Sequence, residues 1–136
     1  MSGAKITSAT FGLYQTASGS TSHTLDLYHV TSFWDAYQTT WNNQPTVGAV
    51  EASLSNNAQN QYWNWDATNL VRAWYGNTQP NYGMMIRHRT ETEASRQFRS
   101  ANNTTNLPRL VINYTVDPIG VESFFVGLHP RWRKRL

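Results

Sequence analysis

Cysteine is absent from this chain of 136 residues, and charged residues make up only 14% of it, against roughly 25% in an average soluble domain. The absence of cysteine excludes a disulfide framework and thiolate chemistry. No apolar run approaches the roughly 20 residues of a membrane-spanning helix, so we expect no membrane insertion. The first residues, MSGAKITSAT, lack the charged and apolar succession of a signal peptide. Any export signal would therefore lie outside this sequence.

Positive charge is concentrated at the C-terminal end rather than spread along the chain. The formal net charge is +3, but four of the eleven basic residues lie in the last six positions: Arg131, Arg133, Lys134 and Arg135. The first 130 residues carry seven basic and eight acidic side chains. A nucleic-acid-binding domain carries a basic patch or stripe on its fold, so nucleic acid is not an expected partner. The basic end is either a solvated tail or a contact with an anionic wall polymer.

Catalytic and metal-binding patterns are also missing. Glycoside hydrolysis needs two carboxylates at a defined separation, and the candidates are scattered: Asp26, Asp35, Glu51 and Asp66. The four histidines show no metal-ligand spacing, and there is no nucleophile elbow. Nothing in the sequence supports a lyase. On these grounds we expect no enzymatic activity, no cofactor and no metal site. A structural calcium ion is the alternative, and no dense cluster of Asp residues supports it.

Aromatic side chains and alternating patterns are abundant instead. Aromatic residues make up 13% of the chain, including six tryptophans and seven tyrosines. Alternation of apolar and polar residues predicts short strands, at residues 4–14, 24–30, 48–54, 62–65, 84–89, 96–99 and 110–114. One helix is expected at about residues 67–75, with Asp66 or Thr68 at its start and Gly76 at its end. Many short strands separated by turn residues predict an all-β sandwich or barrel.

The order of these segments resembles a known family. The residues that carry the resemblance are Trp34, Asp35, Thr40, Trp41, Asn42, Asn43, Pro45, Asp66, Thr68, Val71, Trp74, Asn81, Tyr82 and Gly83. Together they resemble the DNRLRE domain, also classed as carbohydrate-binding module family 96 and similar to the disaggregatase-related repeats. The resemblance runs from about residue 2 to residue 114. It implies an antiparallel jelly-roll-like β-sandwich in secreted or surface-attached microbial proteins, with polysaccharide binding as its role.

The resemblance also sets expectations about the ends of the domain. Domains of this family usually begin with strands that this chain lacks, which implies either a missing N-terminal segment or strand-sharing with another chain. We expect the sandwich domain to span residues 1–115, and residues 116–136 to form a linker and basic tail. The stretch GVESFF at 120–125 is loosely similar to the linker that follows this domain in wall-associated proteins with Rhs repeats.

Tryptophans in the motifs are interpreted as core residues. Trp41 lies in the polar stretch TTWNNQP, where it is predicted to anchor a long loop onto the sandwich, with Asn42 and Asn43 bonding to loop backbone. Trp34 and Trp74 are interpreted in the same way. A sugar-binding role for the Trp41 ring is the alternative. Further along the chain, Trp63 and Trp65 share one face of a strand and are predicted to be buried.

A ligand-binding surface is predicted on the segment 83–100, interpreted as a hairpin. Met84, Ile86 and Phe98 are expected to point inward. Arg87, Arg89, Gln97 and Arg99 would then lie side by side on the outer face, and Tyr62 is a further candidate, opposite Trp63 and Trp65. Guanidinium groups match carboxylates in a two-bond geometry, which suits a polysaccharide that contains uronic acids. The alternative is a solvated face balanced by Glu91 and Glu93.

Two functions remain open at this point. The first is a non-catalytic polysaccharide-binding module of a secreted or cell-surface microbial protein. The second is a structural or interaction domain of a large wall-associated protein that binds no glycan, because an exposed sheet edge invites strand addition by a neighbour.

Overall fold

The computed structural model describes residues 3–18, 22–56, 58–90 and 95–116. In chain order its elements are β1 (Ala4–Ser18), β2 (His23–Val30), the 3₁₀ helix η1 (Trp41–Asn43), β3 (Val47–Asn56), β4 (Gln61–Asp66), α1 (Thr68–Tyr75), β5 (Met84–His88), β6 (Arg96–Phe98) and β7 (Arg109–Val116). Strands dominate, and the predicted all-β fold with one short helix is confirmed. Within the described ranges, no helix has the length and apolar character needed to cross a membrane.

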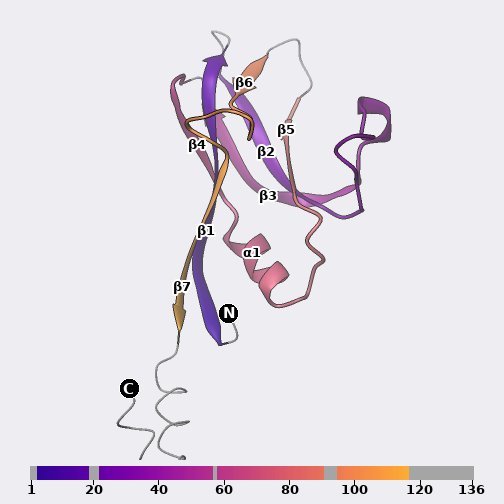
Figure 1. Ribbon diagram of the computed structural model, residues 1–136, viewed down its shortest axis with the longest axis vertical. Coiled ribbons are helices and arrows are strands. Elements are labelled where there is room, and N and C mark those ends of the chain that lie inside the picture. Colours follow the sequence, from indigo (N-terminus) through magenta and orange to yellow (C-terminus); the bar gives the residue numbers. More distant parts are fainter. Residues whose placement is uncertain (1–2, 19–21, 57, 91–94, 117–136) are drawn as a thin grey trace, which may run out of the picture.

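The strands form two antiparallel sheets (Figure 1). In sheet A, the long strand β1 pairs with β4 along one edge and with β7 and then β6 along the other. Sheet B has the order β3–β2–β5. The chain changes sheet between β1 and β2, between β3 and β4, and on both sides of β5. This path gives the predicted antiparallel, jelly-roll-like sandwich.

The core lies between the sheets and is built on aromatic residues of sheet A. Phe11 pairs with Trp65 and Leu13 pairs with Trp63 across β1 and β4. Trp63 and Trp65 are 2% and 0% exposed, and both rings pack against Phe98 of β6. The burial predicted for the tryptophan pair is confirmed. Sheet B closes this core with Leu25, Leu27, Ala52, Leu54, Met84 and Ile86.

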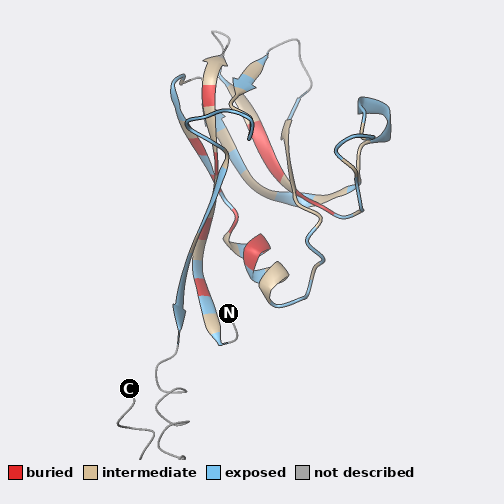
Figure 2. Ribbon diagram, in the orientation of Figure 1, coloured by how far each residue is buried: buried red, intermediate tan, exposed pale blue. Residues whose placement is uncertain are grey.

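Helix α1 follows β4 directly and covers the inner face of β1. The carboxylate of Asp66 accepts a hydrogen bond from the Thr68 backbone N–H at 2.9 Å, which satisfies one of the free donors at the helix start. At the other end, the Gly76 N–H donates to the Arg72 carbonyl. Val71 is buried in the core and Trp74 packs against it, so the predicted core position of Trp74 is confirmed. Figure 2 shows the buried residues concentrated on β1, β2, β4 and α1.

A long loop, residues 31–46, joins β2 to β3 and projects from the sandwich (Figure 1). Two distant parts of the sequence meet at its base, where the indole N–H of Trp34 donates to the Tyr82 carbonyl at 2.7 Å. The neighbouring Gly83 has a φ of +96°, a conformation that favours glycine. Its N–H donates to the Asn81 side chain at 3.1 Å, so the Asn81–Gly83 motif forms the turn that receives Trp34.

Most of the predicted C-terminal segment lies outside the described residues, since 117–136 are not described. The predicted boundary at residue 115 therefore stays a prediction. The strand that ends the described chain, β7, reaches Val116.

Candidate functional site

The predicted arginine surface does not form, because β5 and β6 are not a hairpin. Strand β5 pairs with β2 in sheet B, whereas β6 pairs with β1 in sheet A. Arg87 and Arg89 therefore belong to sheet B, and Gln97 and Arg99 belong to sheet A. The prediction of four side chains on one surface was wrong. Its inward residues were correct, since Met84, Ile86 and Phe98 all pack against the core. Alternation gives the same inward pattern whether the two strands pair with each other or face each other.

Arg89 is bound by a carboxylate of its own sheet. Its Nη2 lies 2.9 Å from Asp26 Oδ1 and its Nε lies 3.1 Å from Oδ2, and Ser53 donates to the same carboxylate at 2.6 Å. The hydrogen bond from Arg89 lowers the pKa of the Asp26 carboxyl, although burial opposes it. A guanidinium already held by two bonds to a carboxylate cannot offer the same two bonds to a ligand.

The outer face of sheet A carries two tyrosines side by side. Tyr14 of β1 and Tyr62 of β4 are directly paired in the register, and their ring centres lie 5.3 Å apart at an angle of 79°. This edge-to-face arrangement is favourable for aromatic pairs. The Tyr62 hydroxyl donates to the Leu107 carbonyl at 3.0 Å, which ties the segment before β7 to this face. Tyr62 thus points away from Trp63 and Trp65, as predicted, but is half-buried.

Two arginines flank the tyrosine pair. The guanidinium carbon of Arg109 lies 3.7 Å from the centre of the Tyr62 ring, and that of Arg99 lies 5.7 Å from the Tyr14 ring. Arg99 also donates to the Thr105 hydroxyl at 3.2 Å. Both contacts are attractive because a cation lies over the negative face of an aromatic ring. We call this group, Tyr14, Tyr62, Arg99 and Arg109, the tyrosine–arginine face.

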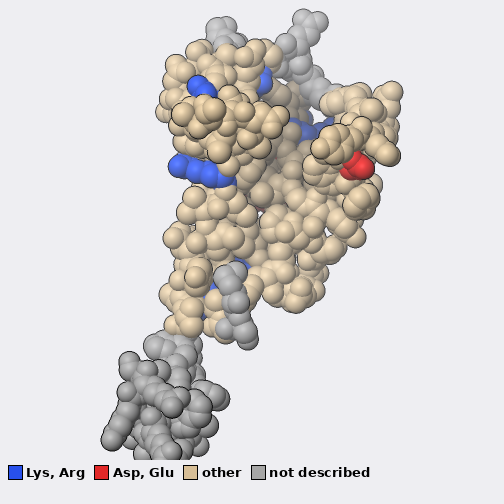
Figure 3. Space-filling view, viewed as in Figure 1, with Lys and Arg blue, Asp and Glu red and all other residues tan. Residues whose placement is uncertain are grey.

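Charge distinguishes the tyrosine–arginine face from the outer face of sheet B. Among the described residues, the ion pairs join Arg89 to Asp26 and His29 to Glu51, and neither Arg99 nor Arg109 has a carboxylate partner. Asp66 lies on the same side of sheet A, but its carboxylate accepts hydrogen bonds from Thr68, which lower its pKa. In Figure 3 most of the Lys and Arg surface lies over the half that contains β1, β4 and β7. The acidic surface in that view lies over the loop between β2 and β3.

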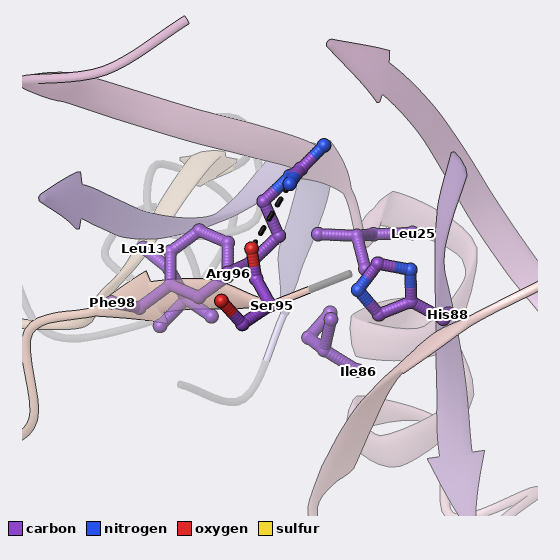
Figure 4. A pocket seen from close by; sticks show the side chains of 7 residues that line it. All are labelled: Leu13, Leu25, Ile86, His88, Ser95, Arg96 and Phe98. Carbon is purple, nitrogen blue, oxygen red and sulfur yellow. Dashed lines mark hydrogen bonds between the residues drawn. The ribbon is translucent and has the colours of Figure 1, made fainter. Parts of the chain in front are cut away.

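A pocket of about 310 Å³ opens between the sheets where β5 faces β6 (Figure 4). Its walls are Leu13, Leu25, Ile86, His88, Ser95, Arg96 and Phe98. Burial is the largest of the effects that lower the pKa of His88, and the nearby charges of His23 and Arg96 add to it. The described lining contains no carboxylate, so it lacks the pair of acids that glycoside hydrolysis requires.

Comparison with models of known families shows which family the chain belongs to. Residues 1–114 match the model of carbohydrate-binding module family 96. The chain belongs to this family. Membership of family 96 makes it a carbohydrate-binding module, and modules of this class are generally non-catalytic. No curated protein matches the chain.

Metal-binding and acid–base groups are sparse in this family 96 module. The part of the chain that the structure describes contains no group of three or more histidines and acids that could hold a metal ion. Each described carboxylate has a structural partner. Asp26 binds Arg89, Glu51 binds His29 at 2.6 Å, and Asp35 accepts from the Tyr37 N–H.

Two of the predicted core tryptophans are exposed. Trp41 is 70% exposed and Trp34 is 43% exposed, so their predicted burial was wrong. Trp34 still fixes the loop, but through its hydrogen bond to Tyr82. Asn43 bonds to the Gln38 carbonyl at 2.9 Å, as predicted for this position, whereas Asn42 is exposed at the loop surface. The motif ending at Pro45 is held by polar contacts because the loop projects away from the core.

Sequence reasoning missed two members of the tyrosine–arginine face. Tyr14 could have been found from the β1–β4 register, but a register that pairs Tyr14 with Tyr62, 48 residues later, is not visible in alternation. Arg109 immediately precedes the apolar run of the last predicted strand and was left outside it. Each strand face was predictable, whereas the neighbours across strands were not.

Proposed function

We propose that this chain is a non-catalytic polysaccharide-binding module that holds acidic glycans on the tyrosine–arginine face. The observation that supports it is the pairing of Tyr14 and Tyr62 between Arg99 and Arg109, neither of which has a carboxylate partner among the described residues. Tyrosine rings pack against the apolar C–H faces of sugars, while guanidinium groups bind carboxylates. Uronic acids present both features in one residue.

The setting proposed for this module is a secreted or cell-surface microbial protein. Family membership supports it, because a polysaccharide ligand of this kind is a wall or extracellular polymer. Binding of such a polymer needs no cofactor. The described carboxylates, each held by a structural partner, support a role without catalysis.

Affinity electrophoresis against alginate and pectate tests this proposal. Arg99→Gln and Arg109→Gln should each reduce retardation, by roughly tenfold in Kd if a charge-assisted contact is lost. Lys5→Gln is the matched control, since it removes one positive charge from β1 seven residues before Gly12. Failure of every acidic polysaccharide to retard the wild-type protein would refute the proposal. An equal loss of retardation in Lys5→Gln would mean that acidic polysaccharides bind by unspecific charge attraction rather than at the tyrosine–arginine face.

A second candidate function rests on the open edge of sheet A. Strand β7 pairs with β1 on one side, and within the described residues no strand pairs with its other side. Its exposed apolar residues are Leu110, Val111, Tyr114 and Val116. An exposed apolar edge strand favours pairing with another chain. We therefore propose, as the alternative, an interaction domain of a large wall-associated protein.

Size-exclusion chromatography with light scattering separates the two functions. An oligomer that dissociates in Val111→Lys and binds no glycan would favour the interaction domain. A monomer that is retarded by acidic polysaccharides would favour the binding module.

A further inference from the structure

The loop between β2 and β3 presents three aromatic rings to solvent. Phe33 is 79% exposed, Tyr37 98% and Trp41 70%. Scattered exposed apolar residues are ordinary on protein surfaces, but a group of large rings within one short segment marks an interaction site. We call residues 31–46, with these rings, the aromatic loop.

Hydrogen bonds hold the aromatic loop in one conformation without burying it. At its base, the Thr31 N–H donates to the Thr46 carbonyl at 2.8 Å, and the two threonine hydroxyls lie 2.7 Å apart. The Asp35 carbonyl accepts from both Gln38 and Thr39. A loop backbone held in this way loses little conformational freedom when a ligand binds.

The tip of the aromatic loop is fixed by a capping box around η1. Thr40 and Asn43 exchange hydrogen bonds between their side chains and backbone, the arrangement that satisfies the free donors at a helix start. The Gln44 side chain donates to the Trp41 carbonyl at 3.1 Å. The Trp41 backbone is therefore held on both sides while its indole ring remains in solvent.

A shallow pocket adjoins the aromatic loop where it meets the turn before β5. It is lined by Phe33, Trp34, Asn81 and Tyr82, and its volume is about 200 Å³. Typical small-molecule pockets range from roughly 300 to 1,000 Å³, so this one suits a single ring rather than a whole oligomer. Aromatic walls beside an asparagine amide combine a stacking surface with a hydrogen-bonding group.

The charge of the aromatic loop restricts the class of ligand. Asp35 is the one residue between 31 and 46 that is charged at neutral pH, and its Oδ1 accepts a hydrogen bond from the Tyr37 N–H at 2.8 Å. The exposed amides of Gln38 and Asn42 lie in the same segment as the rings. Exposed rings with amides and no positive charge suit a neutral, hydroxyl-rich ligand rather than an acidic one, because rings take the apolar sugar face while amides bond to hydroxyls.

We propose that the aromatic loop is a second glycan-binding site, for neutral polysaccharides, with Tyr37 and Trp41 as stacking residues. It is separate from the tyrosine–arginine face, because the loop connects two strands of sheet B and projects away from β1 and β4 (Figure 1). The two sites differ in charge, so each can be lost without the other. Failure of the acidic-glycan site would leave this proposal standing, and the reverse also holds.

Affinity electrophoresis with galactomannan and hydroxyethylcellulose tests the second site. Tyr37→Ala and Trp41→Ala should each weaken retardation by roughly tenfold or more, as expected for aromatic anchors. Trp41→Phe keeps a ring and should restore most of the binding. Tyr114→Ala removes an exposed tyrosine from β7 and is the matched control. Retardation in alginate should be the same for all four variants as for wild type.

Acrylamide quenching of tryptophan fluorescence gives a second readout on the same protein. Neutral polysaccharide should protect wild-type fluorescence from quenching and should give weaker protection in Trp41→Phe, because Trp41 is the most exposed tryptophan of the described residues, at 70% against 43% for Trp34. Unchanged folding of the variants can be checked by circular dichroism.

Three results would overturn the proposal. The first is that neither neutral polysaccharide retards the protein, and the second is that Tyr114→Ala weakens retardation as much as Trp41→Ala does. The third is a wild-type dimer that Trp41→Ala converts to a monomer, which would identify the aromatic loop as a self-association surface.

Discussion

The central guanidinium carbon of Arg109 lies 3.7 Å from the centre of the Tyr62 ring. The two residues belong to β7 and β4, which lie on opposite edges of β1. The Arg109 side chain therefore has to cross β1, and it does so at Gly12, its partner in the register. The absence of a side chain at residue 12 is what leaves room for this contact.

Gly12→Ala should displace Arg109 and weaken binding of acidic glycans. An added methyl group would lie 2.9 Å from Asn64 Oδ1 and 3.1 Å from Arg109 Nε, closer than ordinary contact. Because Arg109 is flexible and exposed, we expect unfolding free energy to change by about 1 kcal/mol or less. Affinity for alginate should fall by roughly tenfold if the charge-assisted contact is lost. Thr10→Ala, two residues earlier on the same face, should leave affinity unchanged. Equal affinities for Gly12→Ala and wild type would contradict this assignment.

Arg89→Leu should reduce stability at neutral pH rather than glycan binding. The pKa of Asp26 is lowered chiefly by its hydrogen bond from Arg89, so the pair stabilises the fold above the ordinary carboxyl pKa. This contribution is lost as pH falls through the lower pKa of the folded state. The Tm of Arg89→Leu should thus lie below that of wild type near pH 7, and the gap should close in acid. In an Asp26→Asn background the same change should show no such pH dependence. A gap that stays constant from neutral to acid would count against the pair.

Acidification should destabilise the fold through His88. Burial, His23 and Arg96 lower the pKa of this histidine, so the unfolded chain binds the proton more readily than the folded protein does. Stability is unaffected while both states are neutral and decreases as pH falls below about 6.5, where an unfolded histidine titrates. His88→Gln should lose less Tm than wild type between about pH 7.5 and about pH 5. His129→Gln serves as the control for histidine number. Parallel pH profiles for His88→Gln and wild type would argue against this role.

Trp41 and Trp65 should differ sharply in their effect on stability. Trp65 is fully buried between the sheets, and truncating a buried tryptophan costs roughly 3–5 kcal/mol. Trp41→Ala removes an exposed ring and should change the free energy of unfolding by about 0.5 kcal/mol or less. Urea denaturation followed by circular dichroism measures both values. A large loss for Trp41→Ala would restore the interpretation of this residue as a core anchor.

The strands were predictable because the alternation of apolar and polar residues that indicates a strand lies within the strand itself. Alternation placed Trp63, Trp65, Met84, Ile86 and Phe98 on inner faces, and the structure agrees at each position. The short helix was also predictable, since Asp66 and Gly76 mark its ends and Leu70 and Val71 share its buried face. Each of these patterns lies within one short segment of the chain, so it can be recognised without knowing which segments are neighbours in space.

The candidate site could not be predicted to the same degree because it depends on pairing between distant strands. Nearness of β5 and β6 in sequence suggested a hairpin, yet each strand bonds to a partner some 60 to 80 residues earlier. The exposure of Trp41 was missed for a related reason. A tryptophan in a polar segment is buried only if the loop folds back, and here polar contacts such as Asn43 to Gln38 hold the loop outward.

Strand β1 forms backbone bonds along both edges over the middle of its length, with β4 on one side and β7 and β6 on the other. No part of sheet A can open without breaking bonds made by this strand. Amide protons at its centre should therefore exchange with solvent only through global unfolding, whereas those of the segment between β2 and β3 exchange through small local fluctuations. The strand that carries Tyr14 thus lasts as long as the native state itself, whereas the aromatic loop can break and re-form its hydrogen bonds while the sandwich stays folded.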